Sequence, residues 1–440
     1  MVLARHAIGL LALGLAVGCS RNAPAPAITR RDRSEDTLDA IRIVAELSAP
    51  AFGGRQAGSE GGRKAGEWIA EKLASLGLAP LTIEFRERVP VMVREPALTA
   101  RIPGGERRSF VFRRDFREVP RGAWIGTKAE GPLAIVESST SPFPRGAIVA
   151  TSGRDYASAI GELYRAAGAA GLLLVLDAEN IEQRPTYPGQ APGALAEPRD
   201  SFVVMAISPE TFDWLKDAAS RNGRASLVNP LGFVDATCKD YLAAWNGDGG
   251  GFDPAFLLLA HYDHVGVDRD GPFPGALDNA SGVAFLLSLA EDFVRDGVKA
   301  DLAFLFTDAE EVNLSGAVAF LRAAPFPLVS LRALNFDMLG SKDSLCLSVY
   351  SSGDRGSLLL AAELSSALRD AGIPASSEHP VSNVDSGPLA EAGARAVTLC
   401  DYEESLHHTH RDRIEGVSGQ ELAVLEDAVY EFILKRLKAR

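Results

Sequence analysis

Residues 256–260 read FLLLA and residues 301–307 read DLAFLFT. Both are short apolar runs of the kind that forms strands, and both are followed by segments with helical periodicity, SGVAFLLSLAEDF and SGAVAFLRAA. The alternation continues through SLRALNFD, LCLSVY, SLLLAAELSSALRDAG and ARAVTLCDY to a C-terminal helix. Strands that alternate with helices predict an α/β fold with a doubly wound, mostly parallel (mixed) sheet and helices on both faces.

Residues 119–229 have a different texture. GAIVATSG, LLLVL and FVVMAIS read as strands, with a helix expected before LLLVL and another, PETFDWLKDAA, after FVVMAIS. This pattern resembles the protease-associated domain, a small β-rich insert of several extracellular peptidase families. A generic α/β insert remains the alternative, because the segment carries no catalytic motif.

Composition and charge exclude several classes of protein. The 440 residues contain 45 basic and 58 acidic side chains, which gives a formal net charge of −13, and 46% of the residues are hydrophobic. This balance excludes a disordered tail and non-specific binding of nucleic acid, which needs a basic surface. Four cysteines in a chain of this length also exclude a disulfide-built scaffold.

The N-terminus has the pattern of an export signal. Arg5 precedes an apolar run that is too short to span a membrane, and Ala16, Val17 and Gly18 lead into Cys19. This resembles a bacterial lipoprotein signal (residues 1–18) with Cys19 as the lipidated residue, and residues 19–35 read as a flexible tether. The resemblance implies an exported lipoprotein of the outer membrane, facing the periplasm or the cell surface, that touches the membrane only through its lipid anchor. An ordinary cleaved signal peptide is the alternative.

Polar side chains gather where the predicted strands end. His261 and Asp263 follow the first strand, Glu310 and Glu311 the second, and Asp337 the third, while the last strand runs into HHTHRD (407–412). Because ligands of open α/β sheets lie at the carboxyl ends of the strands, we expect these side chains to meet. So many carboxylates repel one another unless cations join them, and histidine and carboxylate ligands without thiolates suit Zn²⁺.

Five motifs then resemble one family in the same order. AHYDHVG, GALDNASG, TDAEEVNLSG, NFDMLG and HHTHRD are similar to the co-catalytic di-zinc aminopeptidases, a family that includes the glutamate carboxypeptidase and transferrin-receptor ectodomains. The resemblance implies a catalytic domain built from residues 36–110 and 230–440, with residues 111–229 as the protease-associated insert.

The resemblance also implies roles and two zinc ions per chain. His261 and Asp337 would bind the first ion, Glu311 and His408 the second, and Asp278 would bridge them. Asp263 would orient His261, and Glu310 would be the general base acting on a metal-bound water. His264, His379 and His410 match no ligand of the family, which leaves them as structural or surface residues.

One position departs from the family. The residue before the last metal histidine is usually tyrosine, which stabilises the oxyanion, and here it is His407. Either His407 takes this role, or a nearby tyrosine such as Tyr402 does, or zinc acts alone.

The sequence therefore predicts a zinc-dependent aminopeptidase that removes N-terminal residues from peptides. The alternatives are a carboxypeptidase of the same family, a glutaminyl-cyclase-like acyltransferase, and a binding ectodomain without catalysis. No ligand or base of the family is missing, which argues against the last two. Peptides are the expected partners and nucleic acid is not; the sequence leaves the oligomeric state open.

Overall fold

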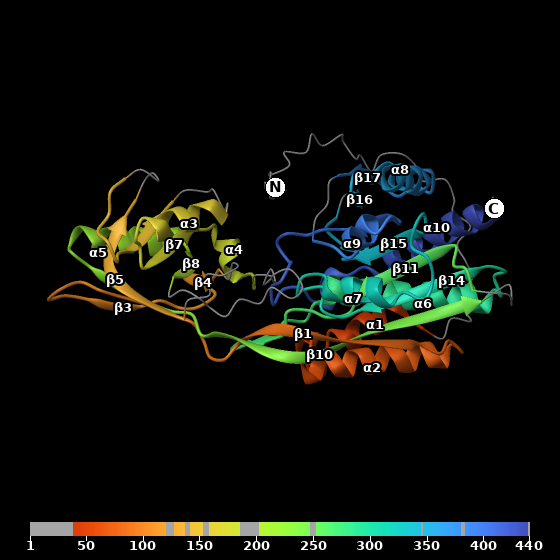
Figure 1. Cartoon of the computed structure of the whole chain (residues 1–440), viewed down its shortest axis with the longest axis horizontal. Helices are drawn as coiled ribbons and strands as arrows, with labels where there is room; N and C mark the ends of the chain where they lie inside the picture. Colours follow the sequence, from red (N-terminus) through yellow and green to blue (C-terminus); the bar gives the residue numbers. More distant parts are fainter. Residues whose placement is uncertain are drawn as a thin grey trace. The chain divides into compact units, whose positions relative to one another are not determined.

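The structure is a computed structural model of the chain. It describes residues 38–119, 127–136, 141–152, 158–184, 202–246, 252–344, 346–379 and 383–438. The predicted signal, Cys19 and the predicted tether lie outside the described residues. The chain divides into two compact units, Pro90–Phe233 and residues 18–89 together with Val234–Arg440, and both are drawn in Figure 1.

The larger unit is built on an eight-stranded sheet. Its strands, in spatial order, are β1 (Leu81–Met92), β10 (Leu231–Asn246), β14 (Asp301–Thr307), β11 (Phe256–His261), β15 (Arg332–Asp337), β18 (Arg395–Cys400), β16 (Leu347–Ser351) and β17 (Ala375–Glu378). The four central strands, β14, β11, β15 and β18, are parallel to one another. β10 and β16 flank them as antiparallel neighbours. The predicted mixed, mostly parallel sheet is therefore confirmed.

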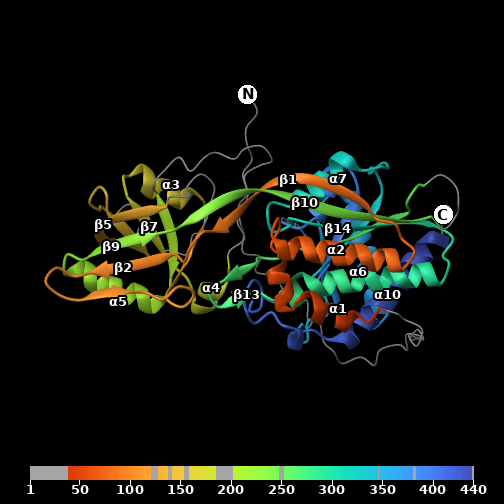
Figure 2. The same ribbon diagram turned by 90° about the horizontal axis from the view of Figure 1, so that it is seen from below.

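Helices cover both faces of this sheet because its central strands are apolar on both sides. Phe256, Leu258 and Ala260 of β11 pack with one set of helices, and Leu257 and Leu259 pack with another. The first set is α1 (Ala40–Leu47), α2 (Glu60–Ser75), α6 (Gly282–Arg295), α8 (Arg355–Asp370) and α10 (Gly419–Lys438). The second set is α7 (Ser315–Ala323) and α9 (Ser386–Glu391). Figure 2 shows α1, α2 and α6 lying over the sheet.

Short elements shape the loops at the carboxyl ends of the strands. They are η1 (Pro50–Arg55), η2 (Ala276–Ser281), η3 (Ile414–Gly416) and the two-stranded pair β12 (Val267–Asp268) and β13 (Gly271–Pro272). Among the described residues, no helix has both the length and the apolar character to cross a membrane.

The smaller unit has a separate eight-stranded sheet. In spatial order its strands are β3 (Arg107–Ser109), β2 (Ala97–Arg101), β9 (Arg224–Val228), β5 (Lys128–Ile135), β6 (Ile148–Thr151), β7 (Gly171–Val175), β8 (Val203–Ile207) and β4 (Phe116–Glu118). Its helices are α3 (Ser158–Ala166), α4 (Ala178–Glu182) and α5 (Pro209–Ser220). β6, β7 and β8 are parallel neighbours with fully or largely buried side chains, as expected from their apolar sequences. The likeness to a protease-associated domain remains a prediction.

Candidate metal centre

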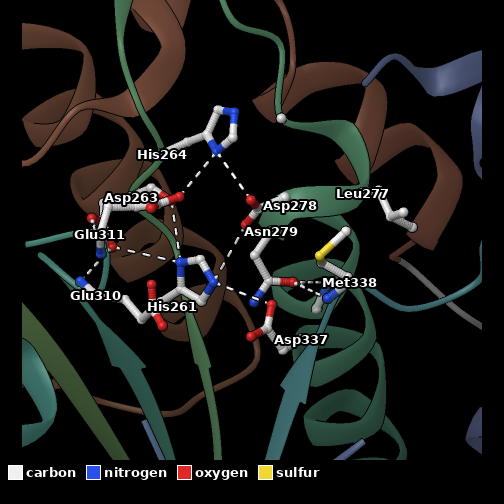
Figure 3. A network of polar contacts seen from close by, with 12 residues as sticks. His261, Asp263, His264, Leu277, Asp278, Asn279, Glu310, Glu311, Asp337 and Met338 are labelled. Carbon is white, nitrogen blue, oxygen red and sulfur yellow. Dashed lines mark hydrogen bonds and ion pairs between the residues drawn. The ribbon is translucent and has the colours of Figure 1, made fainter. Parts of the chain in front are cut away.

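The predicted site residues lie at the carboxyl ends of neighbouring strands. His261 is the last residue of β11 and Asp337 the last of β15, and these strands are adjacent and parallel. Glu310 and Glu311 lie in the loop after β14, and His408 lies in the loop after β18. Figure 3 shows His261, Asp337 and the two glutamates converging with Asp278 of η2. The order β14-β11-β15-β18 therefore brings together side chains that are far apart in the sequence.

One group of possible ligands surrounds His261. Its Nε2 atom lies 3.3 Å from Asp337 Oδ1 and 3.6 Å from Asp278 Oδ1. Glu310 belongs to the same group, since one ligand atom each of His261, Glu310 and Asp337 lie within 4.8 Å of one another. Two of these residues are the predicted ligands of one ion, and Glu310 is beside them where a general base is expected.

A second group surrounds His408. Its Nε2 atom lies 2.9 Å from Glu311 Oε1 and 3.1 Å from Asp278 Oδ2. The Nδ1 atom of His264 faces the same two carboxylates, at 3.4 Å from Glu311 Oε1 and 3.6 Å from Asp278 Oδ2. The structure thus adds His264, for which the sequence supplied no ligand role, to the two residues predicted for this ion.

Asp278 lies between the two groups. Its Oδ1 atom faces His261, and its Oδ2 atom faces His264 and His408. A carboxylate with one oxygen toward each group has the arrangement that a bridge between two ions needs. The peptide bond between Asp278 and Asn279 is cis.

Asp263 binds the loop that carries Glu310 and Glu311 and also contacts His261. Its carboxylate accepts hydrogen bonds from the backbone N–H of Glu310 (2.9 Å) and of Glu311 (3.2 Å). The Nδ1 atom of His261 lies 3.2 Å from the Asp263 carbonyl oxygen and 3.6 Å from Oδ1. These contacts fix the ring so that Nε2 faces Asp337, which is the positioning role predicted for Asp263.

Two residues that the sequence did not assign hold the loop of Asp278. Asp412 accepts hydrogen bonds from the backbone N–H of Leu277 (2.7 Å) and of Asp278 (3.0 Å). Arg55 is fully buried, and its guanidinium donates at 2.8–3.2 Å to five carbonyl oxygens, those of Leu47, Tyr262, Pro274, Gly275 and Asp278. Burial lowers the pKa of Arg55 to about 10, against the opposing effect of Asp278 and Asp412. Asp412 lies in the HHTHRD motif. Arg55 is distant in sequence from all the predicted site residues, and no motif marks it as part of the site.

The electrostatics of the site are incomplete without cations. Burial, reinforced by the neighbouring carboxylates, holds the pKa of Glu310 well above its usual value, although His261 opposes the rise. Burial also acts to raise the pKa of Asp278, but His264, His408 and His261 together hold it well below its usual value. Against the effect of burial, Glu311 and Asp278 raise the pKa of His408 to about 10. Glu310 and His408 therefore favour their protonated forms, and a metal ion bound at His408 would replace its proton.

The residues present fit zinc. Within the described part of the chain, both ring nitrogens of His264 are buried without a hydrogen-bond partner. Buried polar atoms without partners are rare in native proteins, so these atoms fit a metal-binding site. Imidazole and carboxylate donors without a thiolate are a ligand set that Zn²⁺ accepts.

The remaining candidates are placed at different distances from this centre. His407 stacks on His408, with ring centroids 3.7 Å apart, and its Nε2 atom is 3.8 Å from Asp278 Oδ2. Tyr402 packs against His407, with ring centroids 5.3 Å apart, and is half exposed. His407 is therefore the nearer of the two oxyanion candidates. His379 is exposed, and His410 binds Asp268 with Nε2 2.9 Å from Oδ1.

Comparison with known sequences finds a family model that matches the part of the chain carrying the site. Residues 240–433 match Peptidase family M28. A "Probable zinc metalloprotease" of Pyrenophora teres f. teres (strain 0-1) is 38% identical over 93 residues, which cover 20% of this chain and 20% of that protein. The chain thus spans about a fifth of the length of the curated relatives it matches.

Solved structures share the fold. An aminopeptidase from Aneurinibacillus sp. strain AM-1 superposes with a TM-score of 0.67 at 19% identity, over 90% of this chain and 93% of that one. A zinc aminopeptidase from Bacillus subtilis gives a TM-score of 0.63 at 21% identity, over 89% of this chain and 94% of that one.

The part of the chain that carries the two groups of possible ligands is thus similar to zinc metalloproteases. Residues 240–433, which carry the five quoted motifs, are similar to Peptidase family M28.

Proposed function

We propose that the protein is an aminopeptidase that binds two zinc ions and hydrolyses N-terminal residues from peptides. The observation that carries the proposal is the pair of ligand groups joined by Asp278, with Glu310 beside the first group. His261 and Asp337 would hold one ion, Glu311 and His408 the other. When bound, the metals supply Lewis acidity for water and for the scissile carbonyl.

The side chains of this chain would move the proton and position the substrate. Glu310 takes a proton from the attacking water and passes it to the leaving amine, which suits a buried carboxyl with a raised pKa. Asp263 holds Glu310 and Glu311 in place through their backbone N–H groups. His407 donates a hydrogen bond toward the oxygen that becomes negative in the transition state.

The charge of the site favours an amino terminus over a carboxyl terminus as the bound end. Glu310 and Asp337 are carboxylates that a free α-ammonium group can pair with. Arg55, the arginine that lies against the site, is fully buried and already donates to five carbonyl oxygens. It is therefore committed and does not offer its guanidinium to a substrate carboxylate. The likeness in fold to two aminopeptidases supports the same choice.

The test combines a metal assay with a choice of substrates. We expect two zinc ions per chain, release of nitroaniline from aminoacyl-nitroanilides, no cleavage of the same substrates after N-acetylation, and loss of activity on chelation. Fewer than two metals, or full activity after chelation, would refute the two-metal hydrolase. Cleavage from the C-terminus would indicate a carboxypeptidase, and release of ammonia from N-terminal glutamine a cyclase.

We also propose that the protein is exported as a lipoprotein of the outer membrane and that residues 111–229 form a protease-associated domain. The support for export is the sequence of residues 1–19, in which Cys19 follows a short apolar run. Incorporation of labelled palmitate into the wild-type protein and not into a Cys19→Ala variant is expected. Equal labelling of both would remove Cys19 as the lipidation site.

A further inference from the structure

His264 is a buried histidine that the mechanism proposed above does not use. Its exposed fraction is 1%, and within the described part of the chain neither ring nitrogen has a hydrogen-bond partner. A structural histidine of the core usually satisfies at least one ring nitrogen. The Nδ1 atom of His264 instead faces two carboxylates of the site, as Figure 3 shows for Asp278 and Glu311.

The four donor atoms around His264 have the spacing of a tetrahedral site. Four of the six edges between these atoms run from His264 Nδ1 to Glu311 (3.4 Å) and Asp278 (3.6 Å), and from His408 Nε2 to Glu311 (2.9 Å) and Asp278 (3.1 Å). Zinc bonds of about 2.0–2.1 Å to nitrogen and oxygen give a tetrahedron with edges of about 3.3–3.4 Å. The rings of His264 and His408 lie at 76° to each other, so both can point at one ion without stacking.

The group around His261 differs from this arrangement. It offers His261, Asp337 and one oxygen of Asp278, while Glu310 is needed as the base. Three protein ligands leave a coordination position open, which is the pattern of catalytic zinc, whereas four protein ligands close the site, which is the pattern of structural zinc.

We propose that His264 Nδ1 is a fourth protein ligand, so that the ion at Glu311 and His408 is held in a closed site and the ion at His261 and Asp337 keeps the open position. This inference rests on the two-metal centre proposed above. His264, His408, Glu311 and Asp278 would enclose one ion, and the three ligands around His261 would leave a position beside Glu310 for water and substrate.

Metal titration of His264 variants tests the inference by affinity and spectrum. Metal-free wild-type, His264→Ala and His264→Gln proteins are titrated with Co²⁺ against a chelator of known affinity. In the wild type we expect one tight ion with the intense visible bands of four-coordinate cobalt. In both variants the affinity for this ion should fall at least about 100-fold, because a direct ligand matters more than a supporting contact, and the bands should weaken. His410→Ala is the matched control, because His410 binds Asp268 outside both groups, and it should leave both ions unchanged.

Wild-type protein provides a second measurement that needs no substitution. In zinc-loaded protein labelled with ¹⁵N-histidine, we expect three metal-bound imidazoles, one of them through Nδ1. Two metal-bound imidazoles, both through Nε2, would overturn the inference even if the variants failed to fold. Folded variants that bind both ions within about threefold of wild type would overturn it as well. A wild type that binds fewer than two ions would instead refute the proposed two-metal function.

Discussion

Glu310 is the residue on which turnover should depend most. It lies beside His261 and Asp337, and its backbone N–H is fixed by Asp263. We expect Glu310→Gln to lower kcat by about 10²–10⁴-fold, the usual contribution of general acid–base catalysis, with two metals retained. Metal content and kcat of the same preparation check this. Glu67→Gln, at an exposed glutamate paired with Arg63, is the control. If zinc is lost in step with activity, Glu310 is a ligand and not the base.

His407 occupies the position at which the resemblance of the motifs implied a tyrosine. Its ring stacks on His408 and is held neutral, because burial and the charge of His408 lower the pKa of His407 to about 3. A neutral imidazole can still donate one hydrogen bond, so we expect His407→Ala to lower kcat by about 10²–10³-fold, as when an oxyanion donor is removed. KM and metal content should change little. Steady-state kinetics would exclude the residue from the mechanism if kcat were unchanged.

The sequence predicted most of the side chains that meet at the site. It did not predict that His264 and Arg55 lie beside them. His261, Glu311 and Asp337 fall in motifs at strand ends, so the topology rule for parallel sheets predicted that they meet. His264 follows His261 by three residues in a loop, where no periodicity tells whether a side chain points inward. Arg55 is 207–223 residues from four of the five carbonyl oxygens it binds, and its local sequence gives no sign of those contacts.

At the scale of elements, the sequence predicted the strands and a mostly parallel sheet, but not which strands run antiparallel. β11 and β14 are apolar on both faces because helices cover both, and this made them recognisable. β16 runs antiparallel to β18 and β10 antiparallel to β14. Strand direction depends on how the connecting segments cross the sheet, and hydrophobic periodicity carries no information on that.

Arg55 connects three elements and should be a main contributor to the stability of the site. Its guanidinium joins α1, the end of β11 and the loop that leads into η2. Lysine has three donors and no planar fork, so Arg55→Lys leaves at least two buried carbonyl oxygens without a partner. We expect a loss of at least about 3 kcal/mol in the free energy of unfolding, from about 1.5–3 kcal/mol for each charged hydrogen bond.

Urea unfolding of metal-free protein measures this loss, with Arg63→Lys as the control. Arg63 pairs with Glu67 on the exposed side of α2, and its replacement should change stability by less than about 0.5 kcal/mol. Equal effects of the two substitutions would show that the five carbonyl contacts of Arg55 do not stabilise the fold.

In the whole molecule, part of the net charge of −13 is concentrated in one place. Asp263, Asp278, Glu310, Glu311 and Asp337 converge in the larger unit around three histidines. Two zinc ions would add four positive charges there, so folding and metal binding are expected to be linked. In the metal-free protein the raised pKa values of Glu310 and His408 favour the protonated forms of these groups.

This linkage predicts how stability depends on pH. Burial raises the pKa of Asp412, and of Asp385 directly before α9, to about 7. A carboxyl whose pKa is higher in the folded state binds more protons there, so its contribution to stability is lost as pH rises from about 4 to 7. His408, with a pKa raised to about 10, contributes below its unfolded value and loses that contribution between about 6.5 and 10. Both effects make the metal-free protein less stable as pH rises.

Zinc should reverse this trend, because it replaces the proton on His408 and neutralises the carboxylates around it. We therefore expect the difference in Tm between zinc-loaded and metal-free protein to widen from pH 6 to pH 8, as measured by differential scanning calorimetry at fixed free zinc. Asp412→Asn, which cannot ionise, should flatten the slope of the metal-free protein between pH 5 and 7. A difference in Tm that stays constant with pH would mean that the protons held by the metal-free site are not the ones that zinc displaces.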